Sequence, residues 1–351
     1  METVVSNQKW LFSSRIDLSV FLGSAILSII LLTFNSKFDG ETPDWLWISA
    51  ILMIDVAHVW ATSFRVYFDI DELKRRPFLY LFVPISGYII GVALYSESAL
   101  TFWKVLALIA VFHFVRQQYG WIKLYRAKAN ETNEVTKWID TFAIYLATVY
   151  PLMFWMSNLP RNFEWFVQND FVGLPRITEQ ILFPMYVASL GLYGAKSLYF
   201  YFVKGILTVG KDIVLVTTAI CWYLGIVYFN SDYAFTVTNV IIHGVPYFAI
   251  TYFYAKSRRE SASPVYRTLT SNVVVFFMTL WMLAYAEELF WHRGIWHERN
   301  WFFGDNWNLE NMKMYFVPLL ALPQIVHYVL DGFIWRRNTN NNFKLVDNAA
   351  T

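Results

Sequence analysis

The sequence predicts an all-α membrane protein, a polytopic bundle of about ten transmembrane helices. Three observations lead to this fold class. Of 351 residues, 57% are hydrophobic and only 15% are charged, whereas a soluble domain carries about 25% charged residues. Apolar runs of about 20 residues, the length that crosses a bilayer core, recur along the whole chain. Lysine and arginine are also concentrated in alternate connections, as cytoplasmic loops require.

The first half of the chain contains five runs of spanning length. The first run is followed by no cleavage site of the signal-peptide kind, so we expect it to be a permanent span. The five predicted spans lie near residues 17–35, 45–65, 78–96, 100–118 and 138–157.

The second half contains five more runs, of which the first two are the least regular because Lys196 and Lys204 interrupt them. No repeat or low-complexity tract divides the chain, so we expect a single domain, 1–351, with tails at 1–16 and 338–351. The five predicted spans lie near residues 181–203, 212–230, 234–254, 270–290 and 315–335.

The distribution of positive charge predicts the orientation. With the N-terminus inside, 21 of the 28 lysines and arginines would lie in cytoplasmic segments. This bias alternates through every loop, which favours an even number of spans with both termini cytoplasmic. We expect the protein in the inner (cytoplasmic) membrane. The net charge of +2 is too small to indicate a nucleic-acid partner.

Four of the six histidines fall in even-numbered predicted spans, which all run in the same direction. Each lies about 10 to 14 residues from the outer end of its span, or roughly 15–21 Å deep at 1.5 Å per residue. Independent positions would scatter over a core of about 30 Å. We therefore predict one histidine layer near the midplane, made of His58, His113, His243 and His327.

Each of these histidines has a polar companion three or four residues away, which is one turn of a helix. Imidazole with carboxylate suits Fe(II), Mn(II) or Zn(II), with Fe(II) as the leading expectation. The single Cys221 excludes a thiolate cluster. Spacing alone does not separate metal ligands from the residues that orient them. The companions are Asp55; Arg116 and Gln117; Asn239; and Gln324 and Asp331.

We therefore predict that the four histidines coordinate a metal and that Asp55 and Asp331 serve as further ligands or as bases. Arg116 and Gln117 would orient a substrate or a bound water. The many aromatic residues around these spans favour a lipophilic small molecule, or a membrane lipid, as the partner.

Other ionisable residues have simpler expected roles. Arg65 lies four residues before Asp69, which indicates an interfacial ion pair; alternatively, Arg65, Arg116 and Tyr119 line the cytoplasmic mouth of the cavity. Glu287 and Glu288 are expected on a solvated face at an outer helix end, and His292 and His297, in the last outer loop, are expected to be surface or gate residues.

The segments "IIHGVPYF" and "VHYVLDG" distantly resemble the bacterial Brp/Blh-type β-carotene 15,15′-dioxygenases. That resemblance covers about four short motifs and implies a non-haem iron held by histidines from several transmembrane helices. The segments "AHVWATSFRVYFD", "HFVRQQYGWIKLYR" and "HYVLDGFIWRR" are more similar to a set of uncharacterised bacterial membrane proteins. The resemblance favours an iron-dependent oxygenase or oxidoreductase.

Three other functions remain open from the sequence. Buried aspartate and histidine serve as relays in proton- or ion-coupled transporters. Paired histidines on facing helices also hold haem in electron-transfer proteins. Finally, polar residues inside a membrane bundle can serve helix packing alone.

Overall fold

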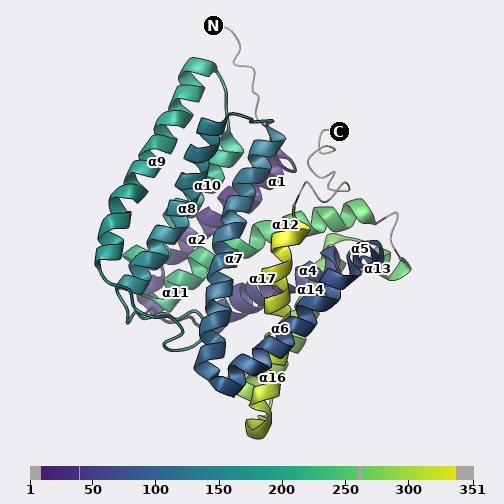
Figure 1. Ribbon diagram of the computed structural model, residues 1–351. Coiled ribbons are helices and arrows are strands. Elements are labelled where there is room, and N and C mark those ends of the chain that lie inside the picture. Colours follow the sequence, from purple (N-terminus) through teal and green to yellow (C-terminus); the bar gives the residue numbers. More distant parts are fainter. Residues whose placement is uncertain (1–8, 39, 260–262, 337–351) are drawn as a thin grey trace.

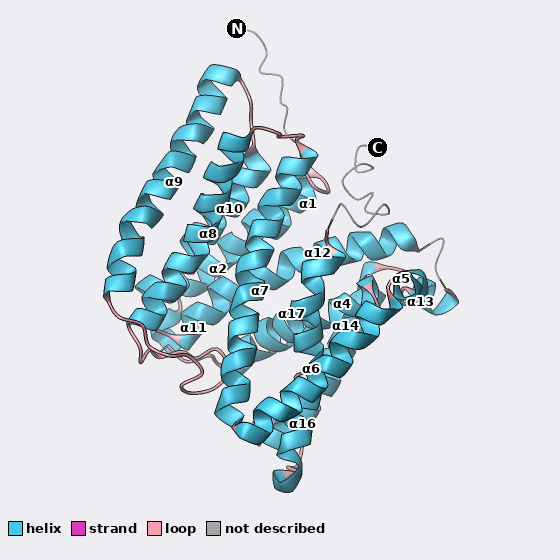
Figure 2. Ribbon diagram, viewed as in Figure 1, coloured by secondary structure: helices cyan, strands magenta, loops and turns pink. Residues whose placement is uncertain are grey.

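The computed structural model describes residues 9–38, 40–259 and 263–336. Within these residues every regular element is helical and none is a strand (Figure 2). In this described part of the chain, ten helices are long and apolar enough to cross a membrane. The prediction of a polytopic helical bundle is therefore confirmed, and each predicted span overlaps one of the ten observed helices.

The first five spans run from Ser14 to Ser157. Two of them combine α-helical and π-helical segments. In chain order they are α1 (Ser14–Asp17), η1 (Leu18–Gly23) and α2 (Ser24–Leu32); α3 (Asp44–Leu46), η3 (Trp47–Val56) and α4 (Ala57–Arg65); α6 (Pro77–Glu97); α7 (Ala99–Lys128); and α8 (Glu134–Ser157).

The last five spans run from Ile177 to Ile334. In chain order they are α9 (Ile177–Lys204); α10 (Val209–Trp222) and η4 (Tyr223–Tyr228); α11 (Asp232–Phe235), η5 (Thr236–Val240) and α12 (Ile241–Arg258); α14 (Val273–Trp291) and η6 (His292–Trp296); and η7 (Glu310–Met312), α16 (Lys313–Leu320) and α17 (Leu322–Ile334). Shorter helices lie in the connections: η2 (Asn35–Phe38), α5 (Ile70–Arg75), α13 (Pro264–Leu269) and α15 (Asn300–Phe303).

The start of α1 and the end of α17 lie at the same end of the bundle (Figure 1). We call this end the terminal face and the opposite end the distal face. Odd-numbered spans run from the terminal face to the distal face, and even-numbered spans run back. Polar residues cap several starts: the side-chain oxygens of Ser98, Asn133 and Asn272 accept backbone N–H groups at the beginnings of α7, α8 and α14.

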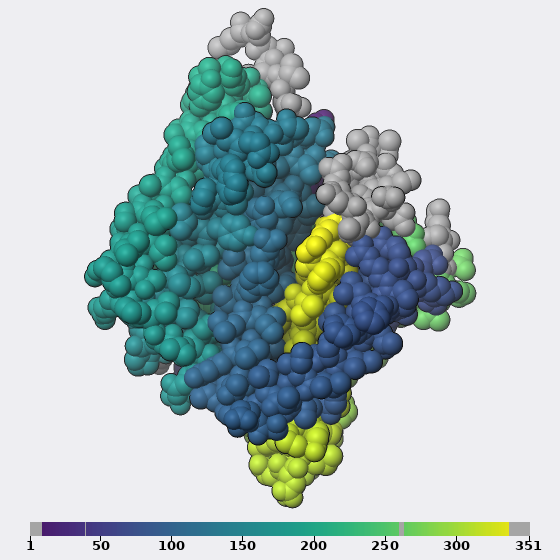
Figure 3. Space-filling view, viewed as in Figure 1, coloured from purple at the N-terminus to yellow at the C-terminus, as the bar shows by residue number. Residues whose placement is uncertain are grey.

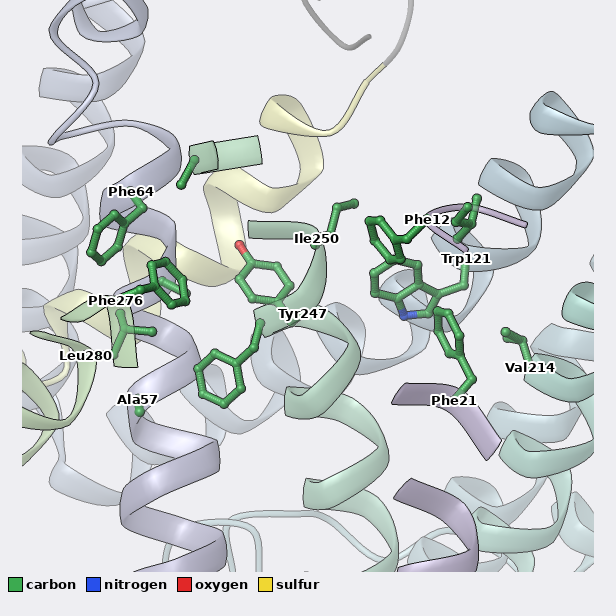
Figure 4. Close-up of a cluster of buried hydrophobic side chains, with 14 of the residues drawn as sticks. Phe12, Phe21, Ala57, Phe64, Trp121, Val214, Tyr247, Ile250, Phe276 and Leu280 are labelled. Carbon is green, nitrogen blue, oxygen red and sulfur yellow. The ribbon is translucent and has the colours of Figure 1, made fainter. Parts of the chain in front are cut away.

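The eighth span is the centre of the bundle, and the sixth is at its edge. In the apolar stretch of the eighth span, 94% of the residues are buried, against 11% in the sixth span. Figure 4 shows Tyr247 of α12 between two groups of buried side chains, with Phe276 and Leu280 on one side and Phe21 and Trp121 on the other. On the surface, α17 is visible as a strip between α6 and α7 (Figure 3).

Of the two lysines that interrupt the apolar runs of the sixth and seventh spans, Lys204 is exposed at the end of α9 and lies over the ring of Tyr199, whereas Lys196 is neutralised inside the bundle. Lys196 of α9 and Lys211 of α10 both form ion pairs with Asp140 of α8, which is 0% exposed. Arg126 of α7 binds the same carboxylate, with 2.6 Å between Nη1 and Oδ2. Ionisable groups inside a membrane protein are normally paired in this way. The network therefore ties together four neighbouring spans.

Candidate metal centre

Four histidines from four separate spans meet in the interior of the bundle. His58 lies on α4, His113 on α7, His243 on α12 and His327 on α17, and all four are at most 3% exposed. One ring nitrogen from each lies within 4.8 Å of the corresponding nitrogens of the other three. The predicted histidine layer is therefore one compact cluster, which we call the tetrahistidine cluster.

The ring nitrogens form two close pairs. Nε2 of His58 lies 3.1 Å from Nε2 of His243, and Nε2 of His113 lies 3.1 Å from Nε2 of His327. Metal–imidazole bonds of about 2.0–2.1 Å in a tetrahedral site place neighbouring donor atoms about 3.3 Å apart. The two pairs match that separation. The remaining separations are at most 4.8 Å, so the donor atoms need to move together by no more than about 1.5 Å to reach this geometry.

Local helix geometry brings two of these histidines into place. The π-helical segment η3 ends at Val56, two residues before His58, and η5 ends at Val240, three residues before His243. A π-helical turn shifts the faces of the helix that follows it and is common at functional sites. Next to His243, Gly244 lets α12 approach the second span: a Cβ there would lie 2.5 Å from Cγ2 of Ile54.

A chain of hydrogen bonds determines how His327 is protonated. The Tyr247 hydroxyl donates to Oδ1 of Asp331 over 2.7 Å. Its oxygen is 3.0 Å from Thr62 Oγ1, so Thr62 must donate to Tyr247. Thr62 Oγ1 is also 2.7 Å from Nδ1 of His327 and can only accept there, so Nδ1 carries the proton. Nε2 of His327 then presents a lone pair to the cluster.

The two predicted carboxylates lie behind the imidazole rings. Asp55 Oδ1 is 3.7 Å from Nδ1 of His58. Asp331 is shared by two rings, with Oδ1 3.8 Å from Nδ1 of His327 and Oδ2 3.9 Å from Nδ1 of His113. In this arrangement the carboxylates face the Nδ1 atoms while the Nε2 atoms face one another. These distances are longer than a hydrogen bond, so Asp55 and Asp331 lie near the rings without bonding to them directly.

Of the other predicted polar companions, some contact the cluster and others do not. Gln117 donates to the backbone carbonyl of His243 over 2.8 Å and so ties α7 to α12. Arg116 is exposed, bonds to Tyr145 and lies over the ring of Tyr119. The structure therefore brings Gln117 to the cluster but does not bring Arg116 there. Among the remaining companions, Gln324 donates to Glu287, and Asn239 bonds within its own helix.

Arg65 is part of a buried ionic network between the cluster and the terminal face. Its Nη1 lies 3.2 Å from Oε2 of Glu72 and donates to the Tyr254 hydroxyl over 3.1 Å. Tyr254 in turn donates to Asp69 over 2.8 Å. The expected ion pair of Arg65 with Asp69 is thus indirect, since Glu72 is the direct partner and Tyr254 joins the two.

The two carboxylates of this network lie between the second and third spans. Burial alone would raise the pKa of Asp69, but hydrogen bonds from Arg258 and Tyr254 and the charge of Arg258 outweigh it and hold the pKa below 3.8. Burial would likewise raise the pKa of Glu72, but the charge of Arg65 and a hydrogen bond from Tyr80 hold it below 4.5. Both groups are therefore stabilised in the ionised form.

The expectation of a solvated outer face around Glu287 and Glu288 is wrong. These side chains are 5% and 7% exposed, and His292 is 2% exposed. Glu287 accepts from the indole of Trp60 over 2.7 Å, and Glu288 lies 3.3 Å from Nε2 of His292. In the segment after α14, the ring of Phe303 stacks on His292, with ring centres 4.6 Å apart.

Sequence reasoning missed two residues of the site. Thr62 follows His58 by four residues, and Tyr247 follows His243 by four residues. This is the same spacing that singled out Asp331 beside His327. Threonine and tyrosine inside a membrane bundle usually serve helix packing, so their residue types alone do not single them out. The spacing itself was the signal that could have found both residues.

The fold and the site together define a multi-pass helical membrane protein with a buried tetrahistidine cluster that is able to bind a metal ion. No family model, no curated protein and no solved structure matches this chain.

Proposed function

We propose that the tetrahistidine cluster binds one transition-metal ion, most suitably Fe(II), and that the protein is a membrane-embedded oxidoreductase or oxygenase for a lipophilic substrate. The observation that supports metal binding best is the hydrogen-bond chain from Asp331 to His327. It directs a bare Nε2 at the Nε2 of His113, 3.1 Å away. A hydrogen bond from a protonated Nε2 of His113 or a shared cation fits such a pair, and the second pair of Nε2 atoms, also 3.1 Å apart, favours a cation at the centre of all four rings.

The donor set limits which metal fits. The residues that group as potential ligands are four imidazoles, with no thiolate among them. Imidazole nitrogen suits iron, zinc and copper, while thiolates would select zinc or an iron–sulfur cluster. We assign iron rather than zinc because of the resemblance to histidine-ligated iron dioxygenases in the "IIHGVPYF" and "VHYVLDG" segments. The choice of iron concerns the identity of the metal and does not affect which residues bind it.

The surrounding residues have distinct tasks in this proposal. A bound iron ion held by the four imidazoles would supply the redox chemistry with oxygen. Asp331 acts on His327 through Tyr247 and Thr62, and Asp55 places a carboxylate 3.7 Å from Nδ1 of His58. Phe114 stacks on His243 with ring centres 3.6 Å apart and excludes water from that side. Tyr247 and Thr62 fix the position of the protons behind His327.

The geometry disfavours haem as the cofactor. Axial histidines lie on opposite faces of a porphyrin, and the plane between them must be free for the ring. Here one ring nitrogen from each of the four histidines lies within 4.8 Å of the other three. If two of the histidines were axial ligands, the other two would occupy the space that the porphyrin ring needs. The same compactness favours a single metal ion.

The first experiment measures the metal content of detergent-purified protein by elemental analysis. We expect close to one equivalent of metal per chain after anaerobic reconstitution with Fe(II). His243→Ala should lose most of it, because the ring is buried at the centre of the cluster. His297→Ala is the matched control, since His297 lies outside the cluster, and it should retain the wild-type content.

The outcomes separate the remaining functions. Wild-type protein that stays metal-free after reconstitution would remove the proposal, and substrate movement by metal-free proteoliposomes would favour a transporter. Equal metal content in wild type and His243→Ala would place the metal elsewhere. One equivalent of zinc that iron does not replace would contradict the redox assignment but not the site.

A further inference from the structure

A cavity of about 270 Å³ lies beside the tetrahistidine cluster. It is lined by α4 and the segment that follows it, α6, α16 and α17, it is partly open to the outside of the bundle, and its lining is mainly apolar. The residues that matter here are Val59, Ser63, Tyr67, Pro84, Leu322 and Val326. Among the residues that the structure describes, no Asp, Glu, Lys, Arg or His lines it. The lining therefore offers no charge to bind a charged ligand.

Most polar atoms on the cavity wall already have protein partners. The Trp60 indole donates to Glu287 over 2.7 Å, and the Tyr67 hydroxyl donates to the backbone carbonyl of Tyr80 over 3.2 Å. Thr62 is committed to Tyr247 and His327. Only the hydroxyl of Ser63 adds a further polar group to the lining. A ligand that needs several hydrogen bonds would leave its own polar groups unpaired there.

The cavity borders the apolar outer surface of the bundle. Leu319, one of the lining residues, is 47% exposed. On α6, Pro84 of the lining lies between Leu81 and Ile85, which are 63% and 50% exposed. These exposed leucine and isoleucine side chains lie in spanning helices, where the surrounding medium is the hydrocarbon of the bilayer. Molecules reach this part of the surface from within the membrane.

We propose that this cavity holds an acyl chain of a membrane phospholipid, admitted sideways from the bilayer. Acyl chains are the bulk component of the medium that borders the cavity, and they need no polar partner. A cavity of about 150 Å³ holds a benzene molecule, so 270 Å³ by proportion holds roughly ten carbon atoms of a chain. That is a segment of one acyl chain rather than a whole lipid.

The bound chain would lie against the metal centre, separated from it by single residues. Thr62 lines the cavity and bonds to His327 Nδ1, and Val326 of the lining precedes His327 in α17. Resting on the proposed function, this contact identifies the substrate class as a lipid with a long hydrocarbon chain. The lipid-binding inference itself stands on the cavity, its lining and its place at the membrane surface.

The test uses the full chain in phosphatidylcholine vesicles that contain a phospholipid with a photoreactive diazirine in its acyl chain. After illumination, mass spectrometry compares labelling of the segment from Val59 to Tyr67 with labelling of the exposed side of α9. We expect severalfold more label in the cavity segment. Ser63→Trp, which fills the cavity, should abolish that excess, and Leu81→Trp on the exposed face of α6 should not. Leu322→Trp fills the cavity from the opposite wall and serves where Ser63→Trp does not fold.

Equal labelling of the cavity segment and α9, or an excess that survives both Ser63→Trp and Leu322→Trp, would overturn the proposal. A photoreactive isoprenoid alcohol that labels the segment while the phospholipid probe does not would overturn the assignment of an acyl chain. The metal content of each variant is measured in parallel. Loss of cavity labelling with metal retained supports the lipid site independently of the metal, whereas metal-free wild type with cavity labelling would remove the proposed function alone.

Discussion

At the scale of single residues, the hydroxyl of Thr62 connects two parts of the site. It accepts the proton of His327 Nδ1 and donates its own proton toward Tyr247, whose hydroxyl donates to Asp331. Partners of this kind hold an imidazole in its ligating form and raise its affinity for metal. Without the hydroxyl, His327 can adopt either tautomer, and one of them presents N–H rather than a lone pair to the cluster.

Thr62→Val should therefore weaken metal binding by about 10–100-fold, the usual effect of losing a residue that orients a ligand. Valine keeps the shape of threonine but lacks the hydroxyl. The measurement is a competition titration with a coloured chelator on reconstituted protein. Thr62→Ser restores the hydroxyl and should recover most of the affinity. Equal affinities for the wild type and both variants would show that the hydroxyl has no part in metal binding.

The sequence predicts the four histidines but not the contact that orients one of them. Regular spacing along a helix identifies Asp331 beside His327 because both lie on the same face. The contact of Thr62 with His327 joins residues 265 positions apart. Spacing carries no information about which helices are neighbours, so this contact becomes visible only once the bundle is assembled. The prediction that Arg116 lies at the site failed for the same reason. Arg116 follows His113 by three residues, but its side chain is exposed and not directed at the cluster.

At the scale of elements, the close approach of the second and eighth spans depends on Gly244. A Cβ at this position would lie 2.5 Å from the side chain and 3.4 Å from the backbone oxygen of Ile54. His58 lies four residues after Ile54, and His243 directly precedes Gly244. A separation of the two spans here would therefore widen the 3.1 Å gap between their Nε2 atoms.

We expect Gly244→Ala to lower the free energy of unfolding by about 1–3 kcal/mol, the usual cost of overpacking, and to reduce metal content. Thermal unfolding in detergent measures the first effect. Gly191→Ala in α9 is the matched control, because nothing lies within 4 Å of a Cβ there. It should be neutral or slightly stabilising, since alanine favours a helix more than glycine does. Adding Ile54→Ala to Gly244→Ala removes the clashing methyl group and should recover part of the loss.

The positions of the spans were largely predictable, because a run of about 20 apolar residues has few other uses. Their ends were less so. The fourth span was expected at 100–118, but α7 continues to Lys128. Buried Arg126 near its end binds Asp140, so a charged residue that suggests a loop is in fact neutralised inside the bundle. Hydropathy does not distinguish a paired charge from a solvated one.

At the scale of the whole molecule, the terminal face is held together by charge and the interior by apolar contacts. The Arg65 network joins the second span to the segment that follows it, to α12 through Tyr254 and to the end of α17 through the carbonyl of Ile334. Removing one member of a buried ion pair leaves the other uncompensated, at a cost of about 3–5 kcal/mol. Stability therefore depends on the ionised state of Asp69 and Glu72.

This dependence predicts the response to acid. The pKa values of Asp69 and Glu72 are lower in the folded protein than their ordinary values of 3.8 and 4.5. Their contribution is therefore complete above about pH 4.5 and is lost as the pH falls through the folded-state values. The midpoint of thermal unfolding in detergent should decline over that range.

The control for this prediction is the double variant Asp69→Asn with Glu72→Gln. It should unfold at a lower temperature than the wild type at neutral pH, yet lose less on acidification, because the titrating groups are gone. Parallel pH profiles for the two proteins would assign acid sensitivity to other carboxylates, such as Asp140.

The four histidines come from the second, fourth, eighth and tenth spans. Their helices are therefore synthesised at widely separated times, from near the beginning of translation to near its end. While the chain is being translated, the ring that His327 contributes is the last to arrive. Loading of an ion by all four rings must therefore wait until every helix has been inserted. A nascent chain halted before α17 offers at most three imidazoles, so an occupied centre marks a polypeptide whose insertion is finished.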